Sequence, residues 1–168
     1  MRTSSKFIVV GSILALSSLT IWLSSPLLVP GYAEVRQTFA QNERIVTLKP
    51  YQSVILTSFE TYGDSAVIAF ALNSSTTSFT VLSSSGSPLT KPVQVLSLRL
   101  PSPGNYSLVV TNTANQTLTV AVTYGVFPYS AIQNFYTITG ILQNASTFFT
   151  VLGLVMVLYG LYLRKKGR

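Results

Sequence analysis

The stretch YSLVVTNTANQTLTVAVTY, residues 106–124, decides the fold of the middle of this chain. It contains two runs in which apolar and polar side chains alternate, and a polar segment separates the two runs. Such alternation is typical of strands that bury one face. We therefore predict strands over residues 106–111 and 117–124, joined as a hairpin. The side chains expected to point inward are Tyr106, Leu108, Val110, Leu118, Val120 and Val122.

The same pattern recurs upstream, and segments rich in Gly, Pro, Asn and Ser separate each run from the next. Further strands are predicted over residues 44–48, 53–59, 66–72, 78–82 and 93–100. Seven short strands with such turns are typical of an antiparallel β-sandwich. The sequence therefore predicts an all-β domain over residues 43–130.

The longer stretch PGNYSLVVTNTANQTLTVAVTYGV, residues 103–126, resembles the closing hairpin of several exported sandwich domains. Immunoglobulin-like, GOLD-type and bacterial prepeptidase-C-terminal domains open this hairpin with Gly-x-Tyr-x-hydrophobic, which here reads Gly104-Asn105-Tyr106-Ser107-Leu108. The resemblance implies a tyrosine corner, in which the Tyr106 hydroxyl bonds to backbone near the start of its strand. We therefore interpret Tyr106 as a structural tyrosine.

Two uncharged apolar runs bracket the predicted sandwich. They read FIVVGSILALSSLTIWL, residues 7–23, and TFFTVLGLVMVLYGLYL, residues 147–163. Either run is close to the length of helix that crosses the hydrocarbon core of a bilayer. Pro26 and Pro30 are expected to end the first helix. The second helix is expected to begin around Ile138, and a basic tail follows it, as in a stop-transfer sequence.

Basic residues cluster outside these runs. The predicted cytoplasmic anchors are Arg2, Lys6, Arg164, Lys165, Lys166 and Arg168. The positive-inside rule then places both termini in the cytoplasm, if the first helix is retained, and an ectodomain outside the cell membrane. These six charges account for most of the formal net charge of +7. The basic balance therefore reports orientation in a lipid bilayer, and we expect no nucleic-acid partner.

Two interpretations of the first run remain open. It is either a retained signal-anchor or a signal peptide, since Gly31-Tyr32-Ala33 offers small residues for cleavage after Ala33. The expected segments are a cytoplasmic basic segment 1–6, the signal-anchor or signal peptide 7–25, an extracytoplasmic linker 26–42, the sandwich 43–130, a juxtamembrane segment 131–142, a transmembrane helix 143–163 and a basic cytoplasmic tail 164–168.

Small residues recur every seven positions in the second run, at Ser146, Gly153 and Gly160. They would form one face of a helix, and small side chains let helices approach closely in lipid. Gly11, Ala15 and Ser18 form a comparable stripe in the first run. We predict that the two helices pair, or that the second helix packs against a protein partner or a further copy of the chain as a homo-oligomer.

Four Asn-x-Ser/Thr sequences are potential acceptors of N-linked glycans. Asn73, Asn105 and Asn115 fall in predicted turns of the exported domain and are the candidate glycosylation sites. Asn144 lies close to the predicted bilayer, and we expect it to be unmodified.

The chain contains no His and no Cys, which excludes triads built on them and the usual zinc and haem ligand sets. Glu60 and Asp64 flank one turn and are interpreted as solvated. We predict no catalytic residue, no cofactor and no metal site. Only 9% of the residues are charged and 41 are Ser or Thr, a composition that resembles surface proteins of thermoacidophilic archaea.

These features favour a non-enzymatic protein of the cell surface or envelope, acting as a structural or accessory subunit of a membrane complex. The alternative is a surface recognition module. It would bind glycan or peptide through loop aromatics such as Tyr51, Tyr62 or Tyr129.

Overall fold

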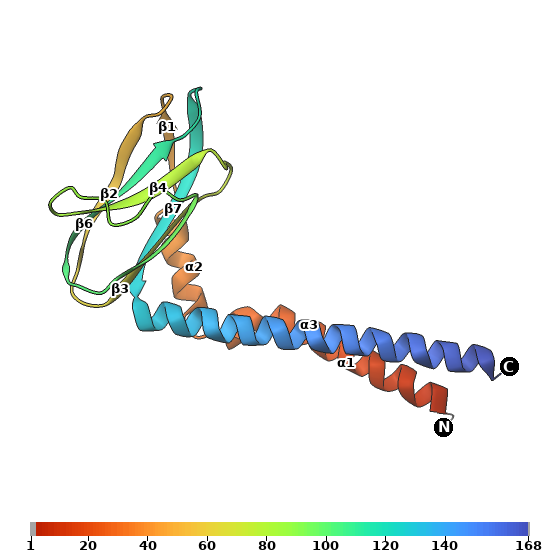
Figure 1. Cartoon of the computed structure of the whole chain (residues 1–168). Coiled ribbons are helices and arrows are strands. Elements are labelled where there is room, and N and C mark those ends of the chain that lie inside the picture. The colour runs from red at the N-terminus through yellow and green to blue at the C-terminus, as the bar shows by residue number, and fades with distance from the viewer. Residues whose placement is uncertain (1–2, 168) are drawn as a thin grey trace. The chain divides into compact units, whose positions relative to one another are not determined.

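The computed structural model describes residues 3–167 of the chain (Figure 1). The chain divides into two compact units. We call Ala33–Gln133 the sandwich unit, and the described parts of Met1–Tyr32 and Asn134–Arg168 the helical unit.

Seven antiparallel strands build the sandwich unit within the described residues (Figure 1). They are β1 (Arg44–Leu48), β2 (Ser53–Thr61), β3 (Ser65–Ala71), β4 (Thr77–Ser83), β5 (Val95–Leu100), β6 (Gly104–Asn112) and β7 (Leu118–Pro128). One sheet has the strand order β1-β7-β3-β5 and the other the order β2-β6-β4. The predicted antiparallel sandwich of seven strands is confirmed.

The two sheets enclose one apolar core. Leu108 and Val110 from β6 are fully buried in the same cluster as Val120 and Val122 from β7. Tyr106 and Leu118 pack against this cluster and are partly buried. Full burial of one such aliphatic side chain contributes about 1.5–3 kcal/mol. The inward positions predicted from the alternation are therefore correct.

The predicted hairpin between the last two strands is wrong. β6 pairs with β2 and β4, whereas β7 pairs with β1 and β3 in the other sheet. The chain crosses between the sheets after Asn112, which is fully buried. The Asn112 Nδ2 donates to the carbonyls of Lys49 (3.0 Å) and Gln116 (2.8 Å), and its Oδ1 accepts a bond from the Ala114 amide (2.9 Å). The Asn112 side-chain amide thus replaces the backbone pairing that a hairpin would supply.

The expected linker, residues 26–42, contains a helix, α2 (Tyr32–Gln41). Phe39 packs on the outer face of the four-stranded sheet, where its ring meets Phe127 at a centroid distance of 5.6 Å. The Thr123 hydroxyl donates to the Phe39 carbonyl (2.6 Å) and satisfies an acceptor at the end of the helix. The part of α2 within the sandwich unit is therefore packed onto the sheet.

Two long helices form the helical unit, α1 (Thr3–Leu28) and, from Asn134 onward, α3 (Tyr129–Lys166). The chain is not purely all-β, because α3 alone has 38 residues and packs against α1. α3 also begins well before Ile138, where we expected it to start. α1 continues through Pro26 and ends before Pro30. Pro26 lacks the amide hydrogen for its own helical bond, but the Val29 amide still donates to the Ser25 carbonyl (3.1 Å) and closes the last turn.

Candidate functional site

The contact between α1 and α3 is the most clearly built candidate site in the helical unit. The two helices run antiparallel, since Gly160 lies beside Ser4, Gly153 beside Gly11 and Ser146 beside Ser18. All three residues predicted to form a helix-packing face on α3 lie in this contact. The structure brings the small-residue stripe of α1 onto the same line.

The glycines in this contact leave no room for a side chain. A Cβ atom added at Gly153 would lie 2.6 Å from the Gly11 carbonyl oxygen and 2.9 Å from the Ala15 amide nitrogen. A Cβ atom added at Gly160 would lie 2.8 Å from the Ser4 carbonyl oxygen and 2.7 Å from Cγ1 of Ile8. These neighbours are largely backbone atoms, which cannot turn aside. Glycine is therefore required for the close approach of the two helices.

Hydroxyl groups close the contact at its other end. The Ser146 hydroxyl donates to the Ser18 carbonyl (3.1 Å), and the Thr150 hydroxyl donates to the Ser146 carbonyl (2.9 Å). The Ser18 and Thr150 hydroxyls also bond to each other. Ser18 and Ser146 are 1% and 7% exposed. Every one of these hydroxyls has a partner within the pair, which suits an apolar surrounding where an unsatisfied polar group is costly.

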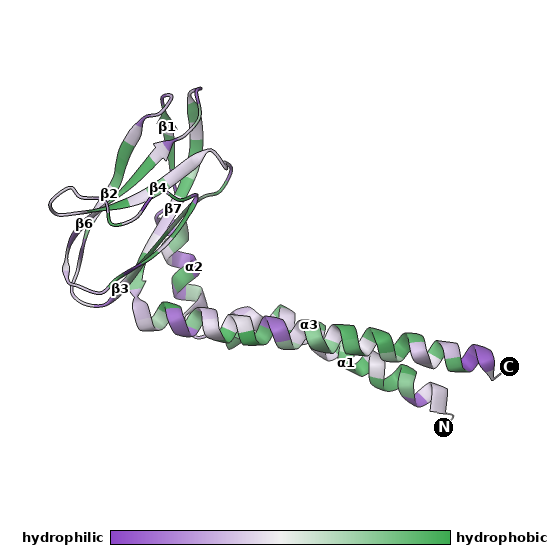
Figure 2. Ribbon diagram, viewed as in Figure 1, coloured by the Kyte–Doolittle hydropathy of each residue, from purple (hydrophilic) through white to green (hydrophobic). Residues whose placement is uncertain are grey.

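Many large apolar side chains are exposed along residues 9–28 of α1 and 148–162 of α3, where the ribbons are mostly green (Figure 2). By length and composition both helices are able to cross a membrane, and α1 also fits an N-terminal signal sequence. In the most apolar 18-residue stretch of each helix, only 11% is buried in α1 and 17% in α3. The core helix of a soluble protein would be mostly buried, whereas most of the apolar surface of these two helices is exposed.

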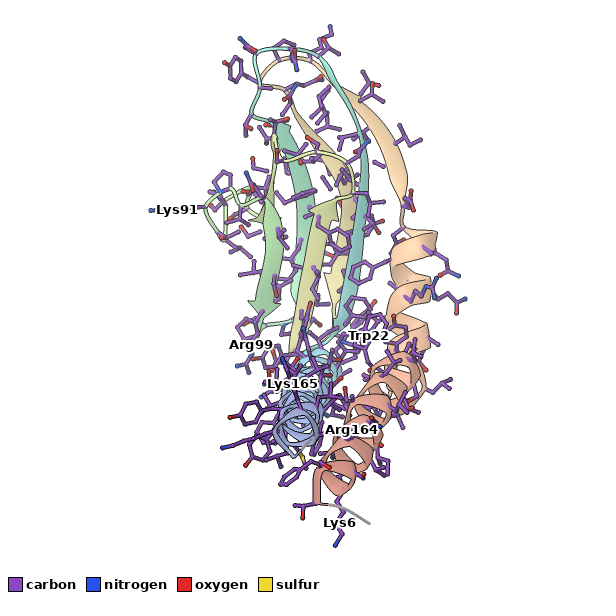
Figure 3. The ribbon with its side chains drawn as sticks, turned by 90° about the vertical axis from the view of Figure 1, so that its right-hand side faces the viewer. Lys6, Trp22, Lys91, Arg99, Arg164 and Lys165 are labelled. Atoms are coloured by element: carbon purple, nitrogen blue, oxygen red, sulfur yellow. The ribbon has the colours of Figure 1, made fainter. Side chains whose placement is uncertain are left out.

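Basic side chains lie at one end of the helical unit. Lys6 lies in the first turn of α1, and Arg164, Lys165 and Lys166 lie in the last turn of α3. Figure 3 labels Lys6, Arg164 and Lys165. The contact of Gly160 with α1 near its start brings these two helix ends together. The predicted anchors Arg2 and Arg168 lie outside the described residues.

The candidate glycosylation sites occupy different surroundings. Asn115 is exposed in the segment between β6 and β7, as expected for a turn. Asn73 is exposed after β3, and its Oδ1 accepts a bond from the Ala121 amide (3.0 Å). Asn105 was expected in a turn but is the second residue of β6, where it pairs with Glu60 of β2. Its side chain is therefore exposed on a sheet face.

Tyr106 lies where its predicted structural role requires. Its hydroxyl donates to the Ser102 carbonyl (3.0 Å), and its ring lies 6.0 Å from that of Phe59. The bond joins the core edge to backbone just before the start of β6, which is the geometry of a tyrosine corner.

Glu60 and Asp64 are paired with different groups. Asp64 accepts two bonds from the Arg99 guanidinium (2.9 and 2.7 Å), and these bonds lower the pKa of the Asp64 carboxyl and raise the pKa of Arg99. Glu60 accepts a bond from the Tyr62 hydroxyl (2.8 Å), which raises the pKa of Tyr62. Within residues 3–167, no group of three or more His, Cys, Asp or Glu residues is placed to hold a metal ion.

Arg99 also joins the first turn of α3 to the sheet within the sandwich unit. It is the penultimate residue of β5 and lies 4.2 Å above the ring of Tyr129; its position is labelled in Figure 3. The Tyr129 amide donates to the Asp64 carbonyl (3.1 Å), so a free donor at the helix start is satisfied by the β2–β3 turn. Sequence reasoning missed this cluster, because Asp64 and Arg99 are 35 positions apart.

The loop aromatics proposed for recognition do not form one patch. Tyr51 precedes β2 and Tyr62 follows it, and their exposed fractions are 67% and 85%. The nine-residue strand β2 lies between them and spans roughly 30 Å at about 3.3 Å per residue. Tyr129 lies under Arg99 instead of projecting freely.

Sequence reasoning also missed a groove of about 610 Å³ on the outer face of the three-stranded sheet. β2, β6 and the end of β4 with its following turn line it. The lining includes Ile55 and Leu82 as apolar side chains, and Ser58, Glu60, Asn105 and Ser107 as polar ones.

No protein-family model matches this sequence. No curated protein matches it either. A solved structure with some similarity is PliG of Aeromonas hydrophila, described as a periplasmic lysozyme inhibitor of g-type lysozyme. The two share 15% sequence identity at a TM-score of 0.40, over 51% of this chain and 82% of that one. At that level the likeness supports no inference about function.

Proposed function

We propose that this chain is a non-enzymatic, membrane-anchored protein of the cell surface or envelope. Its two helices cross the lipid bilayer as one antiparallel pair, with both termini in the cytoplasm. The sandwich unit lies on the extracytoplasmic side and serves as a structural or accessory subunit of a membrane complex. The observation that supports this proposal is the helical unit, which combines a polar, close-packed contact, apolar outward faces and basic residues at one end.

The same contact favours retention of α1 over cleavage near Ala33. Removal of α1 would leave Gly153 and Gly160 facing lipid without a neighbour. It would also take Ser18 away from Ser146 and Thr150. A polar group that loses its partner in hydrocarbon is destabilising. The composition of α3 is therefore suited to a helix whose partner remains attached.

The role as a subunit predicts a stoichiometric protein partner. Co-purification in mild detergent checks the assignment, because a stoichiometric partner supports a subunit. A solitary protein that binds a glycan array would instead support the alternative of a recognition module.

Single cysteines test the topology, because the chain has none of its own. Gln116→Cys lies in the sandwich unit and Lys166→Cys in the last turn of α3. We expect a membrane-impermeant maleimide to label Gln116→Cys on intact cells and to label Lys166→Cys only after permeabilisation. Labelling of both or neither on intact cells would overturn the two-span arrangement.

The mass of the mature protein tests the retention of α1. We expect the intact 18.2 kDa chain, apart from any attached glycan. A mature N-terminus at Glu34 would show that α1 is a cleaved signal peptide.

A further inference from the structure

We propose that the groove on the three-stranded sheet holds the first sugars of a glycan linked to Asn105. The occupant would thus be a covalent modification carried by the chain itself. This inference rests on the proposed export of the sandwich unit, because the sequence motif is an acceptor in exported proteins. It goes beyond that function by assigning a place to the glycan.

The strand geometry directs the acceptor sequence into the groove. Successive side chains of a strand point to opposite faces, so Asn105 and Ser107 share the outer face of β6, while Tyr106 packs against the core and also borders the groove. Glu60 lies directly opposite Asn105, and Ser58 directly opposite Ser107. The Ser58 and Ser107 hydroxyls bond to each other (2.9 Å). Asn105 and Ser107, the two residues that define the glycosylation motif, therefore both line the groove.

Glu60 sets the charge of the groove. It is the charged side chain of the lining, and the lining contains no Lys or Arg. A phosphate or other anion would meet a carboxylate there without a cation to balance it. The Tyr62 hydroxyl donates to one oxygen of Glu60, at Oε2. The second oxygen, on the residue that is paired with Asn105, is an acceptor for a sugar hydroxyl or amide.

The remaining walls suit the other part of a sugar. Ile55 is 58% exposed on this face, and Leu82 is partly buried. A sugar ring presents C–H groups beside its hydroxyls, so it matches a surface that mixes aliphatic side chains with hydroxyls and a carboxylate. The groove therefore fits a neutral, hydroxyl-rich occupant.

The two other candidate sites have no such surface. Asn115 lies in an exposed segment, and neither Asn73 nor Asn115 is part of the groove. A glycan on Asn115 is expected to project into solvent. This difference makes Asn115 a matched control within the same molecule.

The test uses the full chain, purified from a host that glycosylates Asn-x-Ser/Thr sequences. Peptide mapping by mass spectrometry reads whether Asn105 carries a glycan. A single cysteine, Ser84→Cys in the groove lining, reads whether that glycan lies in the groove. We expect a maleimide to label this thiol roughly five-fold more slowly in the glycosylated chain than in an added Asn105→Gln variant, since access limits thiol reaction.

The controls separate position from general effects. Ser87→Cys lies in the same turn but outside the groove lining. Its labelling rate should not respond to Asn105→Gln, and neither thiol should respond to Asn115→Gln. Ser107→Ala removes the acceptor motif without changing Asn105, and should release the Ser84→Cys thiol in the same way.

An unmodified Asn105 peptide would overturn the proposal. So would a glycan on Asn105 that leaves the labelling rate of Ser84→Cys unchanged. Protease access to the sandwich unit in sealed vesicles is measured on the same preparation. A failure of export can thus be distinguished from a failure of the glycan site.

Discussion

At the scale of single residues, the glycines of α3 are not equivalent. A Cβ atom at Gly153 would collide with the backbone of α1, whereas a Cβ atom at Gly140 would meet nothing within 4 Å. Glycine is unfavourable in a helix interior by about 1 kcal/mol relative to alanine. The contact with α1 compensates for that cost at Gly153 and Gly160, and not at Gly140. The pair of positions therefore offers a test with a matched control.

Gly153→Leu is expected to separate the two helices, because the inserted side chain has no space next to the Gly11 carbonyl. Overpacking of this kind costs about 1–3 kcal/mol. A disulfide between Ser18→Cys and Thr150→Cys reports the pairing, since the two native hydroxyls bond to each other. We expect the yield of this crosslink to fall by roughly ten-fold or more in the Gly153→Leu background, since 1.4 kcal/mol corresponds to ten-fold in an equilibrium.

Gly140→Leu, introduced instead of Gly153→Leu into the chain with Ser18→Cys and Thr150→Cys, should leave the crosslink yield unchanged, because open space surrounds that position. Equal crosslink yields in the two leucine variants would show that Gly153 does not determine the pairing.

At the scale of elements, one cluster fixes the start of α3 within the sandwich unit. Asp64 follows β2, Arg99 lies on β5 and Tyr129 begins α3. The carboxylate binds the guanidinium, the guanidinium covers the ring, and the Tyr129 amide donates to the Asp64 carbonyl. The β2–β3 turn, strand β5 and the first turn of α3 are thus joined at one point.

This cluster predicts a pH dependence. The folded-state pKa of Asp64 is lowered from its ordinary value of 3.8, chiefly by the bonds from Arg99. The ion pair therefore stabilises the fold fully above that value, and its contribution is lost as the pH falls below 3.8 through the lower folded-state pKa. Both side chains are substantially exposed, so the effect is small.

Asp64→Asn should lower the melting temperature slightly at pH 5–7, and the difference from the native chain should shrink as the pH falls below 3.8. Thermal melts followed by circular dichroism across this range measure it. Glu43→Gln is the control, because Glu43 forms no salt bridge within residues 3–167. A difference that persists unchanged at pH 2 would mean that the carboxylate charge of Asp64 is not responsible.

The sequence predicted these elements to different degrees, for physical reasons. Alternation of side chains located the strands, with β1 predicted at its observed bounds. It did not reveal that β6 and β7 lie in different sheets, because Leu108 and Val120 point inward in a hairpin and in a crossing alike. The burial of Asn112 makes the difference, and an asparagine in a polar segment is also an ordinary turn residue.

The candidate sites divide in the same way. The seven-residue spacing of Ser146, Gly153 and Gly160 is visible in the sequence, because a helix repeats every 3.6 residues. The groove beside Asn105 is not visible there, because it depends on the register between β2 and β6. The Val35 and Phe39 spacing within α2 was a missed signal, since residues four apart share one helix face.

At the scale of the whole chain, the small-residue face of α3 has a use only if another helix covers it. In this structure α1 lies on that face, so a second copy of the chain has no access to it. The two predictions made for the face, pairing of α1 with α3 and assembly of a homo-oligomer, therefore exclude each other on this surface. Whether α1 is present decides between them.

Residues 1–33 can be replaced by a cleaved signal peptide, which removes α1 from the small-residue face of α3. We expect the shortened chain to form an oligomer through this face, which the full chain does not do. Without α1, the glycines and hydroxyls of α3 regain close packing only against a second α3, because lipid offers neither backbone contact nor hydrogen bonds. Crosslinking through a single cysteine at Thr150, in mild detergent, measures the change. The double substitution Gly153→Leu and Gly160→Leu should abolish the new dimer, while Gly140→Leu should preserve it. A shortened chain that stays monomeric would show that the face of α3 is specific for α1, and a full chain that crosslinks equally well would show that α1 does not cover the face in the bilayer.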